Sequence, residues 1–208
     1  MLIRASSLGN IMTKPKSKDE VLSVGAKTYI KTLAKEFVYG YKEQITSKYM
    51  EKGIMVEDES IALYNKVFGT NYIKNTERKS NEYVTGECDI FTGYSIIDIK
   101  SSWSLATFPC FAEDGQNKDY MWQGVAYMML WDVDEFEIAY CMVNTPEDLI
   151  KYESFDMHLV EHIDESLRVT VLPFKRDKAL EDELIERCTH AQQYYNEMIE
   201  QIALEHNY

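Results

Sequence analysis

GECDIFTGYSIIDIKSSW, residues 86–103, contains two apolar runs separated by a turn at Gly93. Each run is interrupted by a carboxylate, which a buried strand does not usually contain. A short glycine-containing turn between two apolar runs is typical of a β-hairpin. The sequence therefore predicts two neighbouring strands, the first with Asp89 and the second with Asp98 and Lys100, at positions where core residues are expected.

The three charged residues of this hairpin have the pattern of a metal site. Asp89 and Asp98 would place two carboxylates at one edge of a sheet. Residues 98 and 100 of a strand point to the same face, about 6 to 7 Å apart, so Lys100 can reach a phosphate beside the metal. Ile99 points into the core, and its backbone carbonyl is a candidate further ligand.

Oxygen ligands suit Mg²⁺, and Mn²⁺ can substitute for it. Such an ion, together with a fixed cation such as Lys100, is what phosphodiester hydrolysis requires. The alternative is a solvated strand face.

The composition fits one globular domain. The chain has 208 residues, of which 45% are hydrophobic and 12% aromatic, so we expect residues 1–208 to form a single domain with one core. We find no signal-peptide pattern and no apolar run of about 18 residues, so we expect no membrane span and a cytoplasmic location. Four scattered cysteines without a C-x-x-C pair indicate reduced, mostly buried thiols.

The net charge of −13 argues at first sight against a nucleic-acid partner, because Lys and Arg make the phosphate contacts. The charge is unevenly distributed. Residues 1–52 hold ten Lys or Arg against five acids, a balance of +5, which leaves −18 on the remainder. A basic N-terminal portion can face phosphates while the acidic remainder limits unspecific binding to polyanions. The alternative is that these lysines form the solvated face of a helix.

Helical and extended patterns alternate along the chain. Ser17 and Glu20 form a capping box before a helix that ends at Gly40, and a second helical pattern over 54–68 ends at Gly69. We expect strands near 72–78, 82–91, 94–101, 136–143 and 166–174, and helices over 119–131 and 177–205, with Pro146 in the first turn of a short helix. The central order is helix, three strands, helix, strand. It predicts an α/β (α+β) fold with a central mixed sheet flanked by helices.

The pattern of Asp89, a turn and Asp98-x-Lys100 resembles the active-site core of the PD-(D/E)XK nuclease superfamily, whose restriction-endonuclease-like fold has the same αβββαβ order. Residues 123–127, QGVAY, are similar to the Q-x-x-x-Y signature of its RecB-like and phage-exonuclease branch. The resemblance implies that Gln123 orients the catalytic groups near Lys100. Tyr127 would support it from the same helix face. The alternative is a core helix that happens to contain a Gln.

The resemblance covers roughly residues 1–145 and includes two upstream segments. Residues 53–64 resemble the helix in which the family has a glutamate just after a glycine. Glu57 is the matching position, and it would bind the metal directly or through water. An acidic helix surface is the alternative.

The second segment, residues 3–16, resembles the N-terminal part of lambda-exonuclease-like and YqaJ-like viral exonucleases. There, a Ser after an Ala helps to bind the 5′-phosphate of the DNA end. Ser6 matches this position and Arg4 lies nearby, although Ser6 could instead cap a short helix. The family's other phosphate-binding arginines have no clear counterparts here. Ser101 or Ser102 would then serve as hydrogen-bond donors to phosphate.

This resemblance implies a metal-dependent DNA exonuclease, encoded by a phage or prophage. It would digest linear duplex DNA from 5′ ends in a bacterial host cell and leave a 3′ single strand for recombination. Related enzymes work beside a single-strand annealing protein, and some form rings, so we expect a homo-oligomer, with a trimer as one form. The alternatives are a RecB-like or Cas4-like single-strand nuclease, whose iron–sulfur cysteine pattern does not match here, and a catalytically idle DNA-end-binding protein.

A competing metal motif lies at residues 158–162. The sequence HLVEH matches H-x-x-E-H, the inverted zinc-protease pattern, in which two histidines on one helix face bind zinc beside a glutamate base. The segment is acidic and poorly periodic, and few residues follow it to supply a third ligand. We therefore interpret His158 and His162 as surface histidines.

Overall fold

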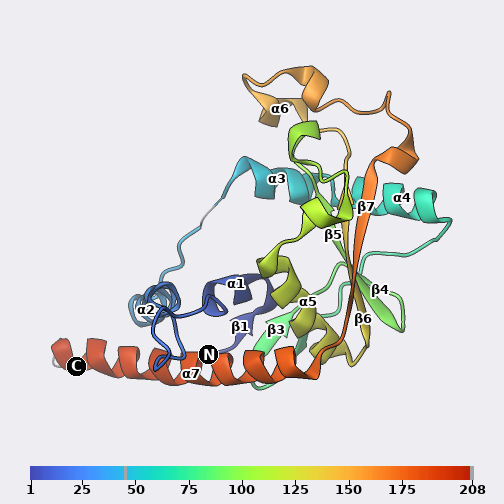
Figure 1. Ribbon diagram of the computed structural model, residues 1–208. Helices are drawn as coiled ribbons and strands as arrows, with labels where there is room; N and C mark the ends of the chain where they lie inside the picture. The colour runs from blue at the N-terminus through green and yellow to red at the C-terminus, as the bar shows by residue number, and fades with distance from the viewer. Residues whose placement is uncertain (45, 207–208) are drawn as a thin grey trace.

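The computed structural model describes residues 1–44 and 46–206 (Figure 1). Its strands form two small sheets. The first sheet has the order β1-β3-β2 and consists of β1 (Ile3–Arg4), β3 (Val84–Gly86) and β2 (Lys79–Ser80). The second has the order β4-β5-β6-β7 and consists of β4 (Ile90–Phe91), β5 (Ser95–Ser101), β6 (Glu135–Cys141) and β7 (Val169–Lys175).

Helices cover both faces of the four-stranded sheet. The α-helices are α1 (Leu8–Ile11), α2 (Val24–Tyr39), α3 (Lys48–Met55), α4 (Glu57–Phe68), α5 (Lys118–Trp131), α6 (Glu147–Ile150) and α7 (Lys178–Glu205). Short 3₁₀ turns are η1 (Ala5–Ser7), η2 (Leu105–Thr107), η3 (Ala112–Gly115), η4 (Phe155–Met157) and η5 (Glu165–Leu167). The helix α5 connects β5 to β6, which run parallel, as such a crossover requires.

The side chains of β5 alternate between two apolar clusters. Ile96 belongs to the larger cluster, which contains α1, α2, α5 and α7, whereas Ile97 and Ile99 belong to the cluster under α4. Because strand side chains alternate, Asp98 and Lys100 share the face of Ile96 and look toward α5. The predicted orientation of Ile99 into the core is thus confirmed. The mixed sheet flanked by helices agrees with the expected fold class.

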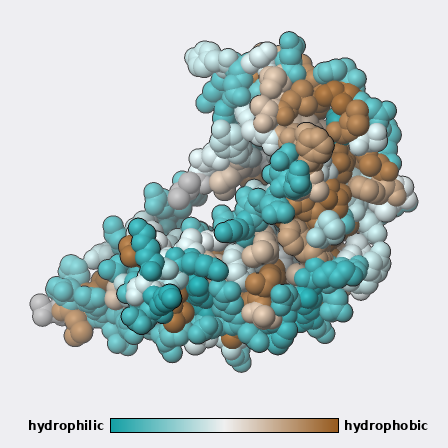
Figure 2. Space-filling model, in the orientation of Figure 1, coloured by the Kyte–Doolittle hydropathy of each residue, from teal (hydrophilic) through white to brown (hydrophobic). Residues whose placement is uncertain are grey.

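A long arm extends from this body. The helices α2 and α7 pack against each other to one side of the sheets, on the left in Figure 1. Figure 2 shows a concave side between the arm and the body. A hollow of about 750 Å³ lies here, and Arg4, Ser7, Tyr41 and Lys42 are among its lining residues.

Several predicted boundaries were wrong. The first long helix begins at Val24 rather than after Ser17, because the Ser17 hydroxyl accepts from the nearby N–H of Asp19 (3.3 Å), while Ser23 caps the helix through the N–H of Ala26 (3.0 Å). The second helical pattern is interrupted at Val56, which leaves the helical conformation and separates α3 from α4.

The strands also differ from the prediction. Residues 72–78 form no strand, and the predicted strand over 82–91 is broken at residues 87–89 into β3 and β4, which belong to different sheets. The hairpin itself is confirmed, with Ile90 paired to Ile97 and Gly93 at a φ of 98° in the turn. Pro146 caps α6 instead of lying in its first turn. The last strand begins three residues later than expected, after η5.

No helix in the part of the chain that the structure describes is long and apolar enough to span a membrane. All four cysteines are free; Cys88, Cys141 and Cys188 are buried, and Cys110 is exposed.

Candidate active site

The strand β5 presents Asp98 and Lys100 on its α5 face. Lys100 Nζ lies 2.6 Å from Asp98 Oδ2, and the Asp98 side chain is only 1% exposed. The ammonium group neutralises Oδ2 in this ion pair, whereas Oδ1 has no hydrogen-bond partner in the part of the chain that the structure describes. A buried carboxylate in this state is costly unless a cation or a donor satisfies it. Asp98 Oδ1 is therefore available to a further positive charge.

Asp89 lies in the break between β3 and β4, and its side chain extends to β5. Its Oδ2 accepts a hydrogen bond from the N–H of Ile99 at 2.7 Å. Burial, together with the negative charge of Asp98, raises the pKa of Asp89 to about 8, although Lys100 and the Ile99 N–H act in the opposite direction. Asp89 and Asp98 line the same hollow, and a cation bound by both carboxylates would relieve the repulsion between their charges.

The backbone of Ile99 also faces this edge. The N–H and the C=O of one strand residue point to the same side, and the Ile99 N–H points to Asp89. Its carbonyl therefore lies on the Asp89 side of β5, beyond the end of the short strand β4. Its use as an oxygen ligand stays a prediction.

Lys100 remains charged in this setting. Burial alone would lower the pKa of Lys100, but the charges of Asp98 and Asp89 outweigh burial and raise it. The Lys100 side chain keeps 20% of its surface exposed. The ammonium group is thus a fixed positive charge that still borders the solvent.

A chain of hydrogen bonds connects α5 to β5 and to the break between β3 and β4. Lys100 Nζ donates to Gln123 Oε1 at 3.3 Å, and Gln123 Nε2 donates to the Tyr127 hydroxyl at 2.9 Å. Tyr127 in turn donates to the carbonyl oxygen of Glu87 at 2.9 Å, two residues before Asp89. The expected orientation of Gln123 toward Lys100 is present. Tyr127 supports it from one helical turn further along.

The sequence prediction missed Tyr120. Its ring centroid lies 4.4 Å from Lys100 Nζ, a cation–π contact that covers the ammonium group from the α5 side. Tyr120 lies three residues before Gln123 and so shares its helix face. That spacing is the signal that could have identified it.

One open hollow of about 400 Å³ is lined by Asp89, Asp98, Ile99, Lys100, Tyr120 and Gln123, together with Tyr49, Met50, Gly53 and Ile54 of α3. We call it the catalytic hollow because it holds the candidate catalytic residues. Glu57 also lines this hollow, but its Oε2 lies 2.6 Å from Lys74 Nζ. Among residues 1–44 and 46–206, no three His, Cys, Asp or Glu side chains converge to form a metal cluster. The structure therefore brings Asp89 and Asp98 together and leaves Glu57 at the wall of the hollow, paired with a lysine.

The predicted phosphate ligands are not gathered at one place. Ser101 lines the catalytic hollow, and its hydroxyl group lies 2.8 Å from that of Ser60. Ser102 is 7% exposed and its hydroxyl has no partner, but it does not line the hollow. Arg4 lines the larger hollow beside the arm, and Ser6 is exposed on η1 without lining either.

The H-x-x-E-H segment is not a zinc site. It forms turns rather than a helix, so its histidines do not share a helix face. His158 is fully buried, which corrects the expectation of two surface histidines, whereas His162 is exposed. The burial of His158 has a specific cause: its ring contacts Trp103 and Thr145 through Nδ1, and Glu153 through Nε2.

The fold and the site together define a nuclease of the PD-(D/E)XK type. Among solved structures, the chain is similar to a phage-related exonuclease from Haemophilus somnus 129PT, with 36% sequence identity and a TM-score of 0.91 over 97% of this chain and 96% of that one. The chain belongs to this lambda-exonuclease and YqaJ-like family.

A second similarity is to the alkaline exonuclease LHK-Exo from Laribacter hongkongensis, with a TM-score of 0.73 over 99% of this chain and 93% of that one. At 16% identity it shows the fold alone. No protein-family model matches the chain, and no curated protein does.

Proposed function

We propose that the chain is a metal-dependent DNA exonuclease that hydrolyses linear duplex DNA from 5′ ends and leaves 3′ single-stranded tails. The neighbouring exonucleases support the nuclease class. The single observation that carries the proposal is the state of Asp98, which is buried, pairs one oxygen with Lys100, leaves the other without a partner among the described residues and shares a hollow with Asp89.

The donor set fits a hard divalent cation. Asp89, Asp98 and the Ile99 carbonyl offer oxygen atoms on one edge of the sheet, and Mg²⁺ prefers such ligands with water in the remaining positions. Mn²⁺ takes the same ligands. Glu57 would join through water, because its carboxylate is already paired with Lys74. A bound ion would supply charge neutralisation and a lowered pKa for a water molecule.

The remaining chemistry belongs to the chain itself. Lys100 is a fixed cation at the open side of the hollow, where it would stabilise the charge that develops on the phosphate. Gln123 and Tyr120 hold its ammonium group in place, so that little reorganisation is needed during the reaction. Tyr127 connects this arrangement to Glu87, in the same break between β3 and β4 that contains Asp89.

We further propose that the enzyme acts in the cytoplasm of a bacterial host beside a single-strand annealing protein, as a homo-oligomer such as a trimeric ring. The net charge of −13 supports a ring, because basic residues are then needed only along the DNA path. Light scattering under active conditions tests the assembly, and a purely monomeric active enzyme would exclude it.

The direct test uses linear duplex DNA with a 5′-phosphate and a label on one end at a time. We expect Mg²⁺-dependent release of nucleotides from the 5′ end, no release in EDTA, and strong loss in Lys100→Ala. Release from the 3′ end would refute the direction. DNA binding without any release in Mg²⁺ or Mn²⁺ would favour an idle end-binding protein, and release only from single strands would favour a RecB-like enzyme.

A further inference from the structure

The connection between β6 and β7 is much longer than its geometry requires. These strands are antiparallel neighbours, which a loop of about two to five residues can join. Here residues 142–168 lie between them, and we call this segment the β6–β7 insertion. In Figure 1 it stands above the sheet near α3. Long ordered loops are commonly functional, so the contacts of this one are informative.

The insertion is anchored by a buried histidine. His158 has no exposed surface, and its Nδ1 lies 3.2 Å from the carbonyl oxygen of Trp103. Its Nε2 lies 3.2 Å from Glu153 Oε2 on the other side of the ring. Trp103 Nε1 donates to the same carboxylate oxygen at 3.0 Å. Two buried rings therefore fix the position of Glu153.

The other oxygen of Glu153 is paired with Lys48, the first residue of α3. Lys48 Nζ also lies 4.5 Å from the Trp103 ring centroid and 5.3 Å from that of Tyr49. The Tyr49 ring stands edge-on to Trp103, with centroids 5.3 Å apart, and it lines the catalytic hollow. The ion pair of the insertion thus lies beside Tyr49 at the α3 side of the hollow, without lining it, and we call this place the mouth of the hollow.

Both members of this pair border the solvent. The side chains of Lys48 and Glu153 are 34% and 40% exposed, so a DNA backbone at the mouth can approach them. The hydrogen bonds from Lys48, Trp103 and His158 hold the pKa of Glu153 at about 2, so its carboxylate stays ionised. A free lysine here would bind a phosphate. The paired one presents little net charge.

We propose that Glu153 is a positioning residue for DNA: it holds Lys48 against Trp103 and Tyr49 at the mouth of the catalytic hollow and cancels its charge, so that Lys48 does not bind the phosphates of passing DNA. This role rests on the proposed nuclease function. It assigns the β6–β7 insertion the task of keeping the mouth in one charge-neutral arrangement while the strand moves.

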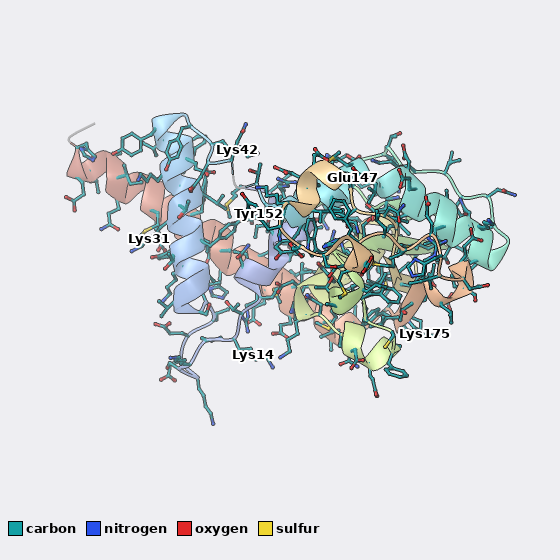
Figure 3. The ribbon with its side chains drawn as sticks, turned by 90° about the horizontal axis from the view of Figure 1, so that it is seen from above. Lys14, Lys31, Lys42, Glu147, Tyr152 and Lys175 are labelled. Carbon is teal, nitrogen blue, oxygen red and sulfur yellow. The ribbon has the colours of Figure 1, made fainter. Side chains whose placement is uncertain are left out.

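The test compares Glu153→Gln with Glu147→Gln, a matched change at an exposed acid of the same insertion (Figure 3). Binding of a 5′-phosphorylated duplex is measured in EDTA at several salt concentrations, without turnover. In Glu153→Gln we expect roughly two- to fivefold tighter binding. The slope of log affinity against log salt should steepen by about 0.9, the value for one added phosphate contact. Glu147→Gln should change neither quantity.

Two further measurements separate positioning from simple structural support. The double variant Lys48→Met with Glu153→Gln should return the salt slope to the wild-type value, because the added contact requires Lys48. In Mg²⁺, Glu153→Gln should lower KM and kcat together, since DNA that is held more tightly leaves more slowly.

An unchanged salt slope in Glu153→Gln, or weaker DNA binding with a lower Tm, would overturn the proposal. If the wild-type protein releases no nucleotides, the proposed function fails, whereas the binding experiment still decides the role of Glu153.

Discussion

Gly124 is the residue of α5 at which a single methyl group should disturb both the fold and the site. A Cβ atom added to Gly124 would lie 2.2, 2.3 and 2.7 Å from three ring atoms of Phe136. Carbon atoms in contact are normally about 3.5 to 4.0 Å apart, so a gap of more than about 1 Å must open. Phe136 is 2% exposed and belongs to β6, which is hydrogen-bonded to strands on both sides, so its ring has little room to move.

The change in the free energy of unfolding of Gly124→Ala is the sum of two opposing contributions. Overpacking of a core costs about 1 to 3 kcal/mol, and three close ring atoms place Gly124→Ala at the upper end. Replacing Gly by Ala inside a helix returns about 1 kcal/mol through helix propensity. We therefore expect a net loss of about 2 kcal/mol in the free energy of unfolding. For a chain of this length that corresponds to a fall in Tm of about 4 to 8 °C.

The assay is urea and thermal unfolding of Gly124→Ala beside Gly25→Ala. Gly25 lies in the first turn of α2, and its added Cβ would meet only the Ser23 hydroxyl oxygen at an ordinary 3.7 Å, so this control should be neutral or slightly stabilised. Nuclease activity should also fall in Gly124→Ala, because the displaced α5 moves Gln123 away from Lys100. A Gly124→Ala protein as stable as wild type would refute the close packing of α5 on β6.

Three further outcomes are expected. Lys100→Met should lower kcat about 10²- to 10³-fold, while calorimetry shows that Mg²⁺ still binds. An equal loss of kcat and of Mg²⁺ affinity would show that Lys100 only maintains the structure of the site. Asp98→Asn should remove the heat of Mg²⁺ binding, and retention of that heat would move the metal elsewhere. Burial lowers the pKa of Lys52 from its ordinary 10.5 to about 8. Between these two pH values the unfolded chain binds more protons than the folded chain, so the free energy of unfolding should rise with pH by up to about 3 kcal/mol. Lys52→Met should lack this rise in urea unfolding, and an identical pH profile would contradict the assignment.

The parts of the fold that depend on local pattern were predictable. The alternation of Ile97, Asp98, Ile99 and Lys100 fixes which side chains share a face of β5, and the structure confirms it. The helix over 119–131 was placed within one residue, because its apolar density and its short loops leave little choice. The meeting of Asp89 with Asp98 followed from the hairpin turn at Gly93.

Other features depend on distant partners that no local pattern contains. The burial of His158 requires Trp103 and Glu153, which are 55 and 5 residues away in the chain. The pairing of Glu57 with Lys74 likewise arises only when α4 meets the segment that follows it. Tyr120 approaches Lys100 because α5 crosses β5, a tertiary contact that the Q-x-x-x-Y pattern does not specify.

The break between β3 and β4 places Asp89 between two sheets. Asp89 sits on the joint of two sheets, three residues after a strand that pairs with the N-terminal strand β1 and one residue before a strand that pairs with β5. Asp89 is therefore connected along the chain to the first sheet and through the Ile99 N–H to β5, whereas Asp98 is part of β5 itself. The relative position of the two acids thus depends on how the two sheets sit together, and not on the hairpin alone.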